Sequence, residues 1–117
     1  MLAHERLDVY QRAIEFLALS VKVLETFPRG HGNLVDQLRR AALSIPLNIA
    51  EGVGKNTTDD QRRYFAIARG SGRPRPRHEC AAILDACRIL KLVEAAQVEQ
   101  GKGLLERVVG MLTKMCR

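Results

Sequence analysis

The feature that most limits how this chain can fold is a helical period in its apolar residues. Between residues 7 and 27, apolar side chains recur at alternating spacings of three and four, the period of an α-helix that buries one face. Three further segments show this period, without strand-type alternation or tandem repeats. The length of 117 residues fits one domain. The pattern therefore predicts an all-α, antiparallel up-and-down four-helix bundle over residues 1–117.

Proline and glycine mark the expected ends of the first two helices. The first helix is predicted to stop near Phe27, because Pro28 disfavours helical geometry in the residue before it. The second is predicted to begin with Asn33 as its N-cap and to end at Gly52 and Gly54.

A proline lies inside the second helical pattern. Pro46 removes one backbone donor and pushes against the carbonyl of Ala42, so we expect a kink there. Ser44 and Asn48 flank the proline and could satisfy the groups that it frees. The segment could be a functional surface, but each residue has a backbone reason to be there, so we favour a structural role. Its defining residues are Ser44, Pro46, Asn48, Glu51 and Gly52.

The third helix is predicted to be interrupted near residues 70–78. Thr57 or Thr58 caps its start. After Arg69, two glycines and two prolines fall within eight residues, which cannot stay α-helical. Helical periodicity resumes over residues 80–90.

The first and last helices each carry two apolar stripes. In the first helix the two stripes together cover an arc of about 160°, wider than a surface helix needs. One stripe can face the core, and the other is a candidate for a neighbouring helix or a second subunit. This docking hypothesis fails if Val9, Phe16 and Val23 already pack within their own subunit. The stripes are Leu7, Tyr10, Ile14, Leu17, Val21 and Leu24, and Val9, Ala13, Phe16, Ser20, Val23 and Phe27.

Charge points to polyanions as partners. The chain has 19 Lys and Arg against 13 Asp and Glu, a net charge of +6, and six arginines without an acid lie between Arg62 and Arg77. Such a stretch attracts RNA or DNA in a salt-dependent manner, and the seven-residue spacing of Arg62 and Arg69 suits successive phosphates. The alternatives are a solvated basic loop or ion pairs with nearby acids, namely Asp36, Glu51, Asp59 and Asp60. The candidate nucleic-acid-binding residues are Arg39, Arg40, Arg62, Arg63, Arg69, Arg73, Arg75 and Arg77.

Several function classes lack the residues that they need. No phosphate loop, HExxH pair or nucleophile elbow occurs, so we expect no enzyme and no cofactor. Cys80, Cys87 and His78 match no zinc pattern, and we interpret both cysteines as core residues, not metal ligands. No apolar run reaches the roughly 20 residues of a membrane span. Three widely spaced cysteines are typical of a reduced cytoplasm.

The segment Gln37–Gly52, QLRRAALSIPLNIAEG, closely resembles the signature of a bacterial four-helix-bundle family. That family includes the proteins encoded by intervening sequences in large-subunit ribosomal RNA genes. The chain is also similar to the accessory variability protein of diversity-generating retroelements. Supporting matches are Tyr10–Ala13, Phe27–Pro28 and Arg63–Ser71. Relative to similar proteins, residues 72–77 look inserted and add three arginines.

The resemblance implies a non-enzymatic bundle that assembles into a homo-oligomeric ring, commonly a pentamer. Retroelement members of the family look like basic barrels that bind a reverse transcriptase and nucleic acid, so both are expected partners. The alternative is a structural or protein-interaction subunit without a nucleic-acid role. That alternative predicts basic residues that are scattered or paired with acids.

Overall fold

The computed structural model describes residues 3–70 and 76–116, and the side chains of residues 6 and 76–78 lie outside this description. Within these residues the fold is all-helical, with five α-helices, one short 3-10 helix and no strand. No helix in the described part is long and apolar enough to cross a membrane. The elements are η1 (Ala3–Arg6), α1 (Asp8–Leu24), α2 (Gly32–Val53), α3 (Thr58–Arg69), α4 (Pro76–Ile89) and α5 (Ala95–Met115).

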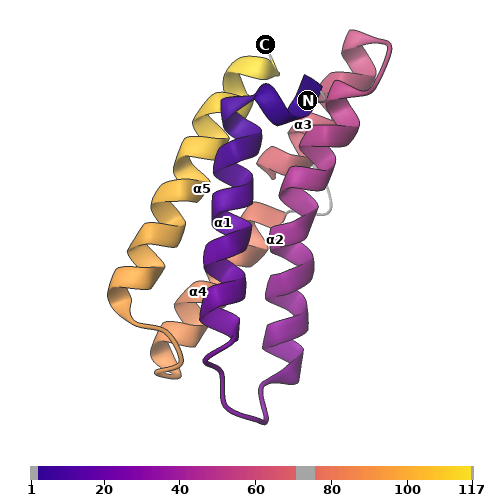
Figure 1. The fold of residues 1–117 in the computed structure, drawn as a ribbon. Coiled ribbons are helices and arrows are strands. Elements are labelled where there is room, and N and C mark those ends of the chain that lie inside the picture. Colours follow the sequence, from indigo (N-terminus) through magenta and orange to yellow (C-terminus); the bar gives the residue numbers. More distant parts are fainter. Residues whose placement is uncertain (1–2, 71–75, 117) are drawn as a thin grey trace.

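The long helices lie side by side, with α1 between α2 and α5 (Figure 1). Helices α3 and α4 each pack against both α2 and α5 and also touch each other. Across the described residues α2 and α5 make no contact, so they lie on opposite sides of the assembly of helices. The predicted interruption separates α3 from α4, which makes five α-helices where the apolar pattern predicts four.

The core includes the α1 stripe that the docking hypothesis needs to be free. Val9, Phe16 and Val23 are buried within their own chain, which contradicts that hypothesis. Most of the other α1 stripe is also packed, because Leu7, Tyr10 and Leu17 contact the same core. The physical reason is that α1 has neighbours on two sides, α2 and α5, which cover the core-facing stripe and most of the other stripe; Val21 of the other stripe stays 39% exposed.

Local signals set most helix ends. Thr57 caps α3 as predicted, since its hydroxyl accepts a hydrogen bond from the Asp60 backbone N–H at 3.2 Å. Gly70 ends α3 in the left-handed region, at φ 94°. The start of α2 differs from the prediction, because His31 is the N-cap residue and Asn33 already lies in the first turn.

Of the two glycines predicted to end α2, Gly54 is confirmed and Gly52 is not. The helix continues to Val53 with Gly54 as the C-cap residue, whereas Gly52 lies buried inside the helix. The helix is continuous through Pro46, whose ring is buried. The signature glycine is therefore explained by packing, not by helix termination.

Candidate nucleic-acid interface

Arg39 and Arg40 lie exposed on α2, upstream of the buried Pro46. Among the described residues neither guanidinium forms an ion pair, so the alternative of pairing with Asp36 or Glu51 does not apply to Arg39 and Arg40. Both side chains are therefore open to a polyanion.

Glu51 pairs instead with Lys55, one turn further along the chain, at 3.1 Å. The Glu51 carboxylate, followed by the phenol group of Tyr64, raises the pKa of the Lys55 ammonium group. Lys55 lies 5.0 Å from the centre of the Tyr64 ring, and the guanidinium carbon of Arg63 lies 5.1 Å from the same centre. Two cations on one ring make a cation–π cluster at the corner between α2 and α3.

Arg62 and Arg69 lie on another side of α3. Arg62 is two residues from Tyr64, which places the two about 160° apart around the helix axis. Arg62 is exposed and Arg69 is half-buried. The shared side of Arg62 and Arg69 is thus turned away from the Lys55–Tyr64–Arg63 cluster.

The remaining predicted arginines belong to the segment between α3 and α4. Arg73 and Arg75 lie outside the described residues, and Arg77 falls in the first turn of α4 with its side chain outside them. The described candidates therefore come from two helices: Arg39 and Arg40 from α2, Arg63 at the corner between α2 and α3, and Arg62 and Arg69 from another side of α3.

The signature segment has backbone roles at several positions. The side-chain amide of Asn48 donates to the Ser44 carbonyl at 2.7 Å and to the Ser44 hydroxyl at 3.0 Å. The carbonyl that Pro46 leaves without its helical donor belongs to Ala42, so this bond is not the repair that the sequence predicts. The two Asn48–Ser44 hydrogen bonds stabilise the helical turn that contains Pro46.

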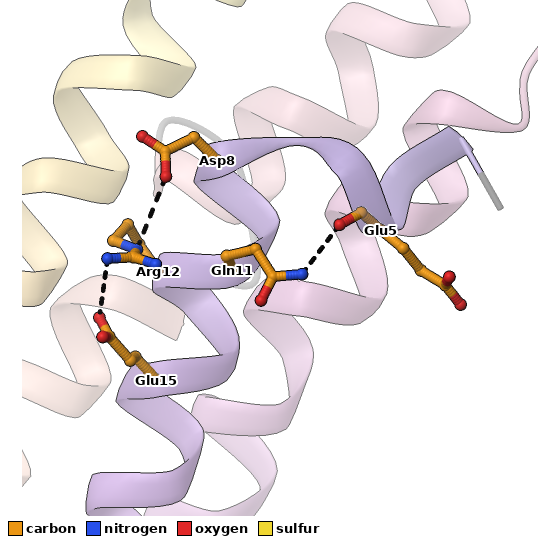
Figure 2. A network of polar contacts seen from close by, with 5 residues as sticks. All are labelled: Glu5, Asp8, Gln11, Arg12 and Glu15. Atoms are coloured by element: carbon orange, nitrogen blue, oxygen red, sulfur yellow. Dashed lines mark hydrogen bonds and ion pairs between the residues drawn. The ribbon is translucent and has the colours of Figure 1, made fainter. Parts of the chain in front are cut away.

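A second polar network joins η1 to α1 (Figure 2). The Arg12 guanidinium lies between two acids, 3.8 Å from Asp8 and 3.5 Å from Glu15. The Gln11 side chain donates to the Glu5 backbone carbonyl at 2.8 Å. The acids on both sides make Arg12 a poor phosphate ligand.

Two apolar residues on the outer side of α2 are absent from the sequence-based predictions. Leu43 is 40% exposed and Leu47 is 57% exposed. A signal for them exists in the sequence, because each lies two residues from Ile45 and so nearly opposite that core residue on a helix.

Cys80 and Cys87 are core residues, as the sequence predicts. Both are buried, and burial raises the pKa of the Cys80 thiol to about 12 and that of Cys87 in the same direction. No group of three metal-ligating side chains gathers anywhere in the described part of the chain.

Comparisons with known proteins agree with this architecture. A family model described as 23S rRNA-intervening sequence protein matches residues 5–114. A solved structure of a protein of unknown function, from the S23 ribosomal protein family of Bacteroides thetaiotaomicron VPI-5482, is similar in fold, with a TM-score of 0.80. The two chains are 17% identical, and the match covers 93% of this chain and 98% of the other. No curated protein matches this chain.

Proposed function

Because the chain belongs to the 23S rRNA-intervening sequence protein family, we propose that it is a non-enzymatic, self-assembling helical protein that binds nucleic acid through exposed arginines. The observation that carries the proposal is the exposure of Arg39 and Arg40 without an acidic partner among the described residues, in a chain of net charge +6. Arginines of this kind contact phosphates and confer little sequence preference.

In the proposed architecture, α3 and α4 occupy one position of a single-domain four-helix bundle over residues 1–117. Support comes from their shared neighbours, since both helices pack against α2 and α5. The resemblance to the family implies assembly into a ring, commonly a pentamer. It also implies a nucleic-acid enzyme such as a reverse transcriptase as a protein partner. Free cysteines support a reducing, cytoplasmic location.

The arginines that we propose as ligands differ in their surroundings. Arg39, Arg40 and Arg63 are exposed and form no ion pair among the described residues. Arg62 and Arg69 add charge on the other side of α3. A nucleic acid that contacts several of these places would follow the surface, as expected for sequence-independent binding. The full proposed set is Arg39, Arg40, Arg62, Arg63, Arg69, Arg73, Arg75 and Arg77.

A salt titration tests the proposal. Binding to a labelled RNA and to a DNA duplex is measured by filter retention or fluorescence anisotropy over a range of salt concentrations. For the wild type, the logarithm of the binding constant is expected to fall linearly with the logarithm of the salt concentration. Arg39→Gln/Arg40→Gln is expected to reduce the slope by up to about 0.9 for each phosphate that is no longer neutralised. Arg12→Gln is the control, because Arg12 already lies between two acids. Absence of binding even at low salt would refute the proposal.

The alternative, a protein-interaction subunit without a nucleic-acid role, also has a specific observation in its favour. The outer side of α2 exposes Leu43 and Leu47, an apolar surface that a protein partner could cover. Under this alternative nucleic-acid binding stays at the background level in the wild type and in the arginine variants. Substitution of the exposed α2 leucines would instead change protein association.

A further inference from the structure

We infer that the outer face of α2 is a docking surface for the α2 helix of a second copy of this chain, with the two helices antiparallel about a two-fold axis. The face consists of Asp36, Arg40, Leu43, Leu47, Glu51 and Lys55, spaced by one helical turn each. Lys55 follows the C-cap residue of the helix.

The centre of this face is apolar and unpartnered within the described part of the chain. Leu43 and Leu47 are 40% and 57% exposed, while Ile45 between them is buried. Helix α2 packs against α1, α3 and α4, and its buried side chains include Leu38, Ile45 and Ile49. Two neighbouring leucines on an otherwise polar helix face are the kind of anchor that a helical partner covers.

The charges on either side of the leucines identify the partner as the same helix. Along α2 the order is acidic, basic, apolar, apolar, acidic, basic, placed nearly symmetrically about residue 45. An antiparallel second copy therefore sets Arg40 opposite Glu51 of that copy and Leu43 opposite its Leu47. A parallel copy would set like charges against each other, which is unfavourable.

The charges at the two ends of the face are also complementary in the antiparallel pair. Asp36 falls opposite Lys55 of the second copy, and neither Asp36 nor Arg40 has an ion-pair partner within the described residues. Glu51 keeps its own Lys55 at 3.1 Å and gains a second cation from the partner. Every charged residue of the face then has an oppositely charged neighbour.

This pairing of α2 helices goes beyond the proposed function. A closed ring is built from head-to-tail contacts, in which two different surfaces meet, whereas the α2 pair is self-complementary and two-fold. It also needs no nucleic acid. Because the paired face spans only a few turns, we expect a weak association in solution, at the low end of specific interfaces.

A charge-exchange experiment tests the pairing. The pairing equilibrium is measured by sedimentation velocity over a concentration series, for the wild type and for Arg40→Glu, Glu51→Arg and the double variant. Each single exchange sets like charges opposite each other at two places, so we expect a Kd for pairing about tenfold higher. The double exchange restores opposite charges and is expected to return the Kd to the wild-type value. Leu47→Ser is expected to weaken pairing without loss of helical circular dichroism, because the side chain is mostly exposed.

The control and the second readout separate this inference from the nucleic-acid proposal. Arg107→Glu makes the same charge change on the exposed side of α5 and is expected to leave pairing unchanged. Glu51→Arg raises the net charge, so it should weaken pairing while nucleic-acid binding is retained or strengthened. Pairing that is insensitive to both single exchanges, or a double variant that is folded but does not pair, would overturn the inference, as would a wild type that stays monomeric. Arg40 belongs to both proposals, so Arg40→Glu is expected to weaken pairing and nucleic-acid binding together, and Glu51→Arg is the variant that separates them. The nucleic-acid affinity of the wild type is measured independently in the salt titration.

Discussion

The ring of Phe65 on α3 occupies the space in which a side chain on Gly52 of α2 would begin. A Cβ atom at residue 52 would lie 2.6 Å from Phe65 Cε1 and 3.2 Å from the backbone carbonyl oxygen of Gln61. Both distances are shorter than ordinary van der Waals contact, so α2 and α3 approach this closely only because residue 52 is glycine.

Gly52→Ala is therefore expected to lower the free energy of unfolding by about 1–3 kcal/mol, because the ring and the Gln61 backbone must both shift. Urea denaturation measures the effect. The matched control is Gly103→Ala in α5, where a Cβ would meet nothing within 4 Å. The free energy of unfolding of that control should rise by up to about 1 kcal/mol, because alanine has a higher helix propensity than glycine. Equal effects at the two glycines would contradict the packing explanation.

Lys91 closes α4 in the left-handed region, at φ 61°. The Leu92 N–H donates to the Cys87 carbonyl at 2.9 Å and the Lys91 N–H to that of Arg88 at 3.0 Å, the pattern of a Schellman motif. Glycine adopts this conformation without the Cβ strain that lysine has, so Lys91→Gly is expected to raise the unfolding free energy by about 1 kcal/mol. Thermal denaturation measures it, and Lys91→Ala, which keeps the Cβ atom, should show no such gain.

Alkaline pH is expected to destabilise the fold through Cys80. Its thiol has a pKa of about 12 when folded, against an ordinary value of 9.0. The contribution to stability is complete below about pH 9 and is lost as the pH rises towards 12, because only the unfolded chain then ionises the thiol. In that window the wild type should lose up to about 1.4 kcal/mol per pH unit more than Cys80→Ala does. Urea denaturation at several pH values tests this, and parallel pH profiles would refute it.

Asn48 is expected to stabilise the turn around Pro46. Asn48→Ala removes the donor to the Ser44 carbonyl and should cost about 1 kcal/mol of unfolding free energy. Asn48→Asp should cost more, because a carboxylate would face that carbonyl oxygen without a proton to donate. Ser44→Ala removes only the hydroxyl acceptor and should have the smallest effect. Chemical denaturation of the three variants gives the order, and an Asp variant as stable as the wild type would argue against this role.

The sequence predicts those parts of the fold that depend on neighbouring residues. Thr57 at the start of α3 and the break after Arg69 are set by hydrogen bonding and steric limits within a few residues, and both predictions are confirmed. The N-cap of α2 and the role of Gly52 differ from the prediction. A glycine can end a helix or admit a neighbouring ring, and local pattern does not distinguish these two uses.

The candidate site divides in the same way. The sequence locates Arg39 and Arg40 and their charge, but which acids lie within reach is a matter of side-chain placement. Glu51 pairs with Lys55, four residues further on, whereas Arg40 lies eleven residues before Glu51, about 16 Å along the helix axis, and is out of reach.

The amino-acid sequence by itself determined the helical class, the positions of the main breaks and the excess of positive charge, since periodicity, capping and composition are properties of the chain. Only the tertiary structure decided which apolar surface is free. Two stripes on α1 are equally apolar, and the presence of neighbours on both sides buries Val9, Phe16 and Val23. Exposed leucines lie instead on α2, at Leu43 and Leu47, and just after α4, at Leu90. Burial depends on what packs against a face, and that is settled only when the helices come together.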